Sequence, residues 1–135
     1  MKQTELHPVL AKDCITVCTL LVCDVLLMND SQYPWLILVP DRPDLKDLDE
    51  LSKDDTPLLY SDINKTSKVL RELFKPTKLN VAALGNMVPQ LHIHVIARFE
   101  SDKAWPRPVW GLHPPQPYAN DDLNDLLTRL RRAFA

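Results

Sequence analysis

The segment Gln90–Phe99 is the feature that most restricts how this chain can fold. Its apolar residues alternate with other side chains, which is typical of a β-strand because successive side chains point to opposite faces. The apolar face, which must meet a hydrophobic core, consists of Leu91, Ile93, Val95, Ala97 and Phe99. The other face carries Gln90, His92 and His94, spaced about 7 Å apart along the strand. The segment therefore predicts a strand with one buried face and two neighbouring imidazoles on the other.

The rest of the hydrophobic pattern predicts four more strands and two helices. The strands are expected at Cys14–Thr19, Cys23–Met28, Trp35–Val39 and Lys78–Leu84. A capping-box pattern at Ser52–Asp55 begins a helix that ends near Phe74, and Asn120 caps a C-terminal helix over about residues 120–134. The order β-β-β-α-β-β-α predicts an α+β domain, a five-stranded antiparallel sheet with helices packed against it. The sequence contains no linker or repeat, so residues 1–135 are expected to form a single domain with its core over about residues 10–111.

Composition excludes several classes of function. The chain has only two glycines, Gly85 and Gly111, so it can form neither a Walker loop nor a dinucleotide-binding fingerprint. A formal net charge of −2 gives no basic surface for a nucleic acid polymer. The longest apolar stretch, Val17–Met28, is interrupted by Thr19 and Asp24 and is shorter than the roughly 20 residues of a membrane helix. With no signal-peptide pattern, we expect a cytoplasmic protein that binds neither a nucleic acid polymer nor a membrane.

The three cysteines all fall in the same apolar stretch, at Cys14, Cys18 and Cys23. Their number is odd and they form no CxxC spacing, which argues against a disulfide framework or a zinc cluster. We therefore expect reduced, buried thiols that pack as small hydrophobic groups.

Three interpretations of the histidine pair remain open from the residues alone. In the first, the rings are hydrogen-bonded structural groups on a half-exposed sheet face. In the second, His92 and His94 supply two zinc ligands, but a third ligand is needed and Gln90 is a poor one. In the third, one imidazole attacks phosphorus while the other manages protons and charge on the phosphate oxygens. A neutral imidazole is available near pH 7 because its free pKa is about 6.5.

The segment Gln90–Ile96 resembles the signature of the histidine triad (HIT) family, in which three histidines alternate with hydrophobic residues, here with glutamine in the first position. The resemblance covers roughly residues 10–111, because flanking segments agree with the family in order and spacing. The segments are Leu26–Asn29 and Trp35–Pro40 for the nucleotide-pocket strands, Lys78–Val81 and Gly85–Val88 for the phosphate loop, and Trp105–Pro108 for the tryptophan-proline stretch of the Hint branch.

The resemblance implies a nucleotidyl hydrolase or transferase that acts on a purine nucleotide conjugate, either a nucleoside phosphoramidate or a dinucleoside polyphosphate. His92 aligns with the histidine that attacks the α-phosphorus and forms a nucleotidyl-imidazole. His94 aligns with the histidine that contacts the phosphate oxygens and the leaving group. The resemblance further implies that no cofactor or metal is required and that the protein is a homodimer.

The resemblance also assigns contacts to the nucleotide. Asn29 falls at a ribose contact, Asn80 and Asn86 fall where amide side chains meet phosphate, and the loop with Met87 and Val88 would add backbone N–H donors. An apolar pocket for the purine is expected around Leu27 and Ile37.

Two positions depart from the family pattern. Gln90 replaces the first histidine, and glutamine forms hydrogen bonds but carries no charge at neutral pH. Pro34-Trp35-Leu36 stands where members often carry Pro-Gly-His, so a supporting imidazole that would help to orient His92 is missing. Gln90 is expected to orient or tune the site, and a non-catalytic nucleotide-binding module is the alternative function. A zinc-binding protein that uses His92 and His94 is a further alternative.

Overall fold

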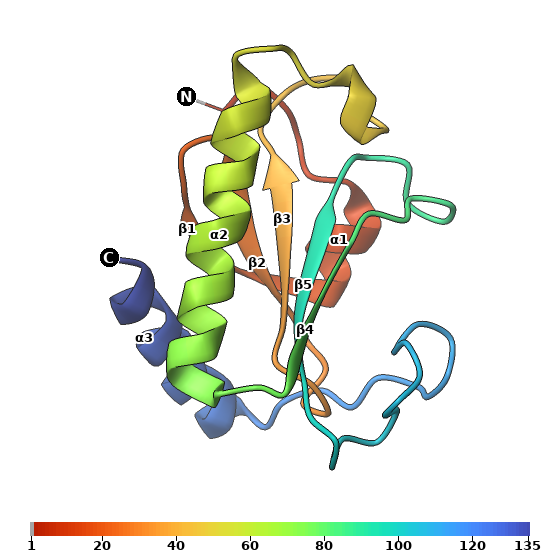
Figure 1. The fold of residues 1–135 in the computed structure, drawn as a ribbon, viewed down its shortest axis with the longest axis vertical. Coiled ribbons are helices and arrows are strands. Elements are labelled where there is room, and N and C mark those ends of the chain that lie inside the picture. Colours follow the sequence, from red (N-terminus) through yellow and green to blue (C-terminus); the bar gives the residue numbers. More distant parts are fainter. Residues whose placement is uncertain (1) are drawn as a thin grey trace.

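The computed structural model describes residues 2–135, which form a five-stranded sheet flanked by helices (Figure 1). Neighbouring strands are antiparallel, and their order is β1-β2-β3-β5-β4. This arrangement confirms the predicted α+β fold. The elements are α1 (Pro8–Asp13), β1 (Cys14–Thr19), β2 (Cys23–Met28), β3 (Trp35–Pro40), a 3-10 turn (Leu48–Glu50), α2 (Asp55–Phe74), β4 (Lys78–Ala82), β5 (Ile93–Arg98) and α3 (Asn120–Phe134).

Strands β1 and β2 have the predicted bounds, but the two strands nearest the histidines are shorter than predicted. β4 ends at Ala82 and β5 begins at Ile93, so Gln90 and His92 precede the strand. The reason is a change of backbone partner, because the Leu91 amide donates to the Leu45 carbonyl at 2.9 Å instead of continuing the sheet. At the other end the Phe99 amide donates to the Asp102 side chain at 3.0 Å, which ends β5 at Arg98.

The helix ends agree with the sequence pattern only in part. Ser52 accepts a hydrogen bond from the Asp55 amide at 3.1 Å, which is half of the predicted capping box. Asn120 is the first residue of α3 and not its cap, since Ala119 precedes the helix without a side-chain bond in the described chain. The short α1 and the 3-10 turn were not predicted.

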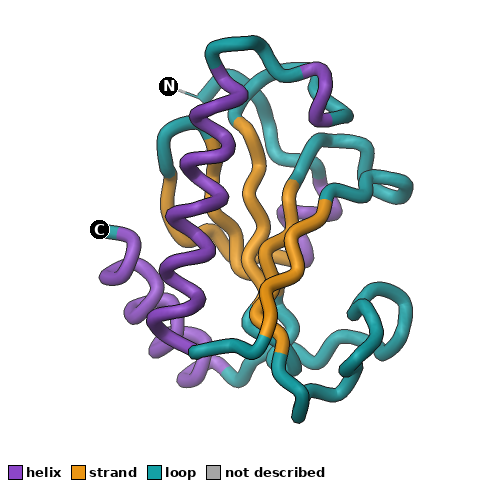
Figure 2. The backbone as a smooth tube through the Cα atoms, in the orientation of Figure 1, coloured by secondary structure: helices purple, strands orange, loops and turns teal. Residues whose placement is uncertain are grey.

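The two faces of the sheet meet different parts of the chain. Figure 2 shows α2 and α3 together on one side of the strands, with long loops on the other. Beneath these helices, alternate residues of β5 such as Ile93, Val95 and Ala97 pack into one hydrophobic core. Ile96 belongs to a second core with Leu10 of α1. The alternation therefore places His92 and His94 on the face turned away from α2 and α3, as the sequence predicts.

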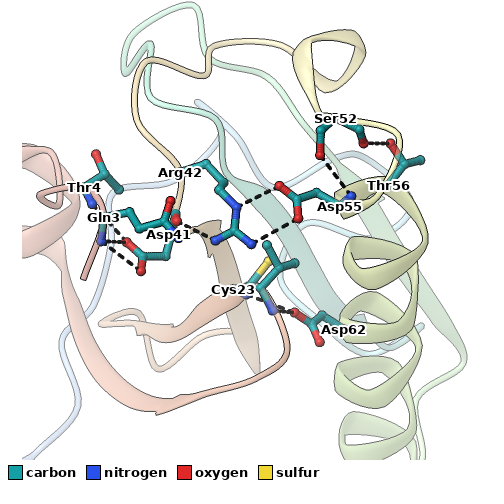
Figure 3. Close-up of polar contacts among 10 residues, drawn as sticks. Gln3, Thr4, Cys23, Asp41, Arg42, Ser52, Asp55, Thr56 and Asp62 are labelled. Carbon is teal, nitrogen blue, oxygen red and sulfur yellow. Dashed lines mark hydrogen bonds and ion pairs between the residues drawn. The ribbon is translucent and has the colours of Figure 1, made fainter. Parts of the chain in front are cut away.

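Two carboxylates of α2 position the connections around the sheet (Figure 3). Asp62, which is 2% exposed, accepts backbone N–H bonds from Leu21, Val22 and Cys23 and so holds the β1–β2 turn. Asp55 takes two hydrogen bonds from the Arg42 guanidinium, at 2.7 and 3.0 Å. The second pair ties the segment that follows β3 to the start of α2, and this segment forms one wall of the site described below.

The cysteines are free thiols within residues 2–135. Cys23 is buried, whereas Cys14 and Cys18 are half-buried, so the expected burial holds fully for only one of them. Burial is the main cause that raises the pKa of all three, to about 12 for Cys14. Such thiols are poor nucleophiles at neutral pH, because the thiolate is the reactive form.

Across residues 2–135, no helix is both long enough and apolar enough to cross a membrane.

Candidate active site

His92 and His94 form a close pair at the start of β5. Their ring centroids lie 4.9 Å apart and their planes are inclined by 68°. Each residue is only 6% exposed, so the pair is not on the half-exposed face that a purely structural interpretation assumes. At this separation the two imidazoles are close enough to act on one small group.

The hydrogen bond of His92 defines which of its nitrogens is free. Its Nδ1 lies 2.6 Å from the backbone carbonyl oxygen of Gln90. Because a carbonyl only accepts hydrogen bonds, Nδ1 must carry the proton, and a neutral ring then has its lone pair on Nε2. His92 is therefore oriented with a nucleophilic nitrogen away from the backbone.

His94 has the opposite arrangement. The indole Nε1 of Trp35 lies 3.0 Å from His94 Nδ1, and an indole N–H only donates, so Nδ1 is the acceptor. A neutral His94 then carries its proton on Nε2. Burial, with a smaller contribution from the charge of His92, lowers the pKa of His94 to about 3. At neutral pH the pair therefore offers one lone pair and one N–H donor.

Two indoles enclose His94, and we call Trp35 and Trp110 the aromatic wall. The His94 ring lies 5.7 Å from Trp35 and 5.1 Å from Trp110 by ring centroid, and the two indoles meet edge to face at 6.1 Å. Trp35 begins β3, while Trp110 comes from the loop that joins β5 to α3. The wall removes His94 from water, which is the physical cause of its low pKa.

Arg98 anchors the loop that carries Trp110. Its side chain is 2% exposed and forms a two-point ion pair with Asp102, with Nε–Oδ2 at 2.7 Å. It also donates to the Arg107 carbonyl at 2.8 Å. Burial alone would raise the pKa of Asp102, but hydrogen bonds from Arg98 and the backbone bring it below its usual value. Sequence reasoning missed Arg98, although the alternation 92, 94, 96, 98 places its charge on the face of the histidines.

The side chain of Gln90 points away from the histidine pair. Its Oε1 accepts from the His7 amide at 2.7 Å, and its Nε2 donates to the Glu5 carbonyl at 3.0 Å. This corrects the orienting role expected of the Gln90 side chain. The backbone carbonyl of Gln90 contacts His92, while the side chain holds the N-terminal segment. The sequence predicts that a supporting imidazole is missing at Pro34-Trp35-Leu36, and in the structure the Trp35 indole N–H of this segment donates to His94 Nδ1.

A depression of about 330 Å³ reaches His92. Residues 46–49, around the 3-10 turn, line one side of it, and residues 83–85, after β4, line the other. Gly85 has a φ of 87°, a left-handed conformation that glycine adopts without strain. This depression gives a ligand a route to His92. Lys46, Asp47 and Asp49 were not singled out from the sequence, because they belong to the site only through the fold.

The predicted phosphate and ribose contacts have different surroundings. Asn86 and Met87 lie on the exposed loop after Gly85, with Met87 93% exposed, while Val88 is buried in the core beside α1. The side-chain oxygen of Asn29 accepts from the Tyr118 amide at 2.9 Å, and that of Asn80 accepts from Arg98 at 2.8 Å. Both amide oxygens therefore already have partners within the protein.

The expected purine pocket around Leu27 and Ile37 is wrong. Both residues are 1% exposed, and they lie on opposite faces of the sheet. Leu27 packs in the core beneath α2 and α3, so it cannot touch a ligand that contacts His92. Leu26, its neighbour, is the residue that pairs with Ile37 in the sheet register. The error arose because a continuous apolar run does not show which residues point to which face.

The zinc interpretation needs a third ligand near His92 and His94. In the described part of the chain, no group of three or more His, Cys, Asp or Glu side chains is placed to hold a metal ion. The Nδ1 atoms of both rings are also engaged, by Gln90 and Trp35.

The sheet topology and the histidine pair define this protein as one of the histidine triad type, and comparisons with known proteins agree. The HIT domain family model matches residues 11–101. The chain belongs to the HIT family. No curated protein matches it.

Solved structures extend this similarity over most of the chain. A histidine triad protein from Bradyrhizobium japonicum is 43% identical with a TM-score of 0.94, and the match covers 97% of this chain and 98% of that one. A histidine triad protein from Marinobacter aquaeolei is also 43% identical, with coverages of 96% and 95% and a TM-score of 0.93. A hypothetical histidine triad nucleotide-binding protein from Sulfolobus tokodaii shares the fold at 15% identity, with a TM-score of 0.67 and coverages of 90% and 83%.

Proposed function

We propose that this protein is a nucleotidyl hydrolase or transferase that cleaves purine nucleotide conjugates at the α-phosphorus through a covalent bond to His92. The observation that carries the proposal is the complementary hydrogen bonding of the pair. His92 Nδ1 is held by the Gln90 carbonyl, and His94 Nδ1 is held by the Trp35 indole. A nucleophile and a hydrogen-bond donor are thus fixed side by side, as nucleophilic catalysis at phosphorus requires.

The reaction has two displacements at the α-phosphorus. In the first, the Nε2 lone pair of His92 forms the N–P bond, and the bond to the leaving group breaks with its electron pair. The ring keeps its Nδ1 proton and becomes positive, which strengthens its bond to the Gln90 carbonyl. In the second, water attacks phosphorus, the N–P bond breaks, and its electron pair returns to Nε2 while the water proton passes to solvent. His94 Nε2–H donates to a phosphate oxygen in both steps.

Nucleotide binding is assigned to the depression beside His92 and the loop that follows Gly85. Backbone N–H groups of residues 86–88 and the exposed Asn86 amide are available donors for phosphate oxygens. HIT family proteins bind nucleotides, and the Sulfolobus tokodaii neighbour is described as a nucleotide-binding protein. Asn29 and Asn80 would contribute through their amide N–H groups, since their oxygens already have partners.

We also propose that the protein is a cytoplasmic homodimer. Free thiols suit a reducing compartment. β4 is an edge strand whose Val81 is 48% exposed, and Tyr60 on α2 is 67% exposed. Both residues line the same surface hollow of about 790 Å³ between α2 and β4. An uncovered edge with apolar neighbours favours pairing with a second copy, which sedimentation analysis would detect as twice the monomer mass.

The central experiment is incubation of metal-free protein with adenosine phosphoramidate and with diadenosine polyphosphates. We expect AMP and an acid-labile nucleotidyl adduct, both lost in His92→Ala and both retained in the matched control His113→Ala. Nucleotide binding without any adduct in the wild type would instead identify a non-catalytic binding module. That alternative is favoured by the position of Gln90, whose side chain takes no part in the pair.

A further inference from the structure

The histidine pair has a nucleophile and a hydrogen-bond donor, but it has no protonated group that can release its proton to a departing group. His92 must lack a proton on Nε2 in order to attack, and its Nδ1 proton is directed to the Gln90 carbonyl at 2.6 Å. Gln90 itself does not titrate, and its side chain is bonded to the N-terminal segment. His94 is therefore the group of the pair that could act as an acid.

The bond from Trp35 prevents His94 from acting as an acid. Becoming an acid requires a second proton on Nδ1, which would then face the indole N–H across only 3.0 Å. Two donors in that position lose their hydrogen bond and repel each other, and an indole cannot turn round to accept. The aromatic wall excludes the water that would otherwise solvate an imidazolium. The lowering of the His94 pKa to about 3 agrees with this geometry.

The charged residues of the depression are not linked to the histidine pair. Lys46, Asp47 and Asp49 line it, but no hydrogen bond within residues 2–135 connects any of these side chains to either ring. Glu50 accepts from the backbone amides of Lys46 and Asp47, so its carboxylate is occupied in holding the turn. One cation and two carboxylates give these lining side chains a net formal charge of −1, so the charge of the lining does not by itself attract an anionic leaving group.

We propose that Trp35 is a specificity-determining residue that restricts the site to leaving groups which depart without a proton. This inference rests on the proposed nucleotidyl transfer. In a phosphoanhydride, the breaking P–O bond leaves its electron pair on a phosphate oxygen, which is stable as an anion. In a phosphoramidate, the nitrogen must gain a proton before the P–N bond breaks, and no group in the pair supplies it. The substrate class is therefore a nucleotide joined through phosphate to a second phosphate or a sugar phosphate.

Histidine at position 35 would change this selectivity. Unlike indole, an imidazole can accept a hydrogen bond from Nδ1–H, so it tolerates a protonated His94. Trp35→His should therefore allow His94 to act as a general acid. Trp35→Phe removes the donor without adding an acceptor, and it tests the loss of the hydrogen bond alone.

The experiment compares single-turnover formation of the His92 adduct from two donors of the same AMP group, diadenosine triphosphate and adenosine phosphoramidate. In the wild type, the anhydride should react about 100-fold faster or more, the size of a missing general-acid contribution. Trp35→His should reduce this ratio by about the same factor. Trp105→Phe is the matched control, since no ring contact or hydrogen bond within residues 2–135 joins this third indole to either histidine, and the ratio should stay as in the wild type.

A second measurement does not depend on turnover. Nitrogen-15 NMR of the His94 ring should show a protonated Nε2 and a bare Nδ1 in the wild type and in Trp105→Phe. In Trp35→Phe, both tautomers should be populated. A proton on Nδ1 in the wild type would overturn the inference.

The outcomes separate the two proposals. Equal rates for both donors, with an adduct on His92, would overturn the specificity and leave nucleotidyl transfer intact. An unchanged ratio in a folded Trp35→His variant would also overturn it. If neither donor gives an adduct, the proposed function fails and the specificity fails with it.

Discussion

On the helix-covered face of β5, Ile93, Val95 and Ala97 are at most 2% exposed and pack in an apolar core. On the opposite face His92, His94 and Arg98 are nearly as buried, at 6%, 6% and 2%. Each of these three has a polar partner, respectively the Gln90 carbonyl, the Trp35 indole and the Asp102 carboxylate. Burial on the helix-covered face therefore needs only complementary shape and apolar surface. Burial on the opposite face, called the polar face below, needs specific hydrogen-bond partners from other segments of the chain.

The largest expected effect on stability comes from removing a partner on the polar face. Arg98→Leu would leave the Asp102 carboxylate, whose side chain is 4% exposed, without its cation. We expect the free energy of unfolding to fall by about 3–5 kcal/mol, as measured by denaturant titration. Arg107→Leu is the matched control, because that residue is exposed and should change stability by less than about 0.5 kcal/mol. Similar losses in both variants would remove the distinction between the faces.

A cavity on the apolar face should cost somewhat less. Leu36 is 0% exposed and packs beneath α2 and α3, so Leu36→Ala should lower the free energy of unfolding by about 2–5 kcal/mol. Leu21→Ala provides the comparison, since Leu21 is 64% exposed and its truncation should cost less than about 0.5 kcal/mol. The nucleotidyl adduct should still form in the folded fraction of Leu36→Ala, because the partners of His92 and His94 are unchanged.

Lowering the pH should reduce the free energy of unfolding through His94 on the polar face. His94 has its pKa lowered to about 3 in the folded protein, whereas an unfolded histidine titrates near its ordinary value of about 6.5. Between these values the unfolded state binds a proton that the folded state does not, so stability falls as the pH decreases. Between pH 7.5 and pH 5, His94 should account for a loss of about 2 kcal/mol.

This contribution is measured as the difference between wild type and His94→Asn in denaturant titrations at the two pH values. If the two proteins lose the same stability on acidification, His94 is not held neutral by its surroundings.

The smallest expected effect on stability comes from the start of α2, which belongs to neither face of the sheet. Ser52→Ala removes the side-chain bond to the Asp55 amide, and it should lower the free energy of unfolding by about 1 kcal/mol. Ser61→Ala, at an exposed position within α2, should leave stability unchanged or raise it slightly. A loss from Ser61→Ala as large as that from Ser52→Ala would show that capping is not the cause.

Much of the fold could be predicted because it depends on neighbours in the sequence. The alternation of Leu91, Ile93 and Val95 identified the buried face of β5, and the bounds of β1 and β2 agreed with the structure. The start of β5 could not be predicted, since it depends on the bond between Leu91 and Leu45, which lie far apart in the sequence. The purine pocket failed for a related reason, because an apolar run does not tell on which face Leu27 lies.

The candidate site divides in the same way. By itself, the sequence determined that His92 and His94 share one face, since strand geometry sets this over two residues. It also determined family membership, because the motif and its flanks keep their order. Only the tertiary structure decided which nitrogen of each ring carries the proton, since this depends on Trp35 and the Gln90 carbonyl. Tautomers and the pKa of His94 follow from partners and burial, and both exist only after distant segments have packed together.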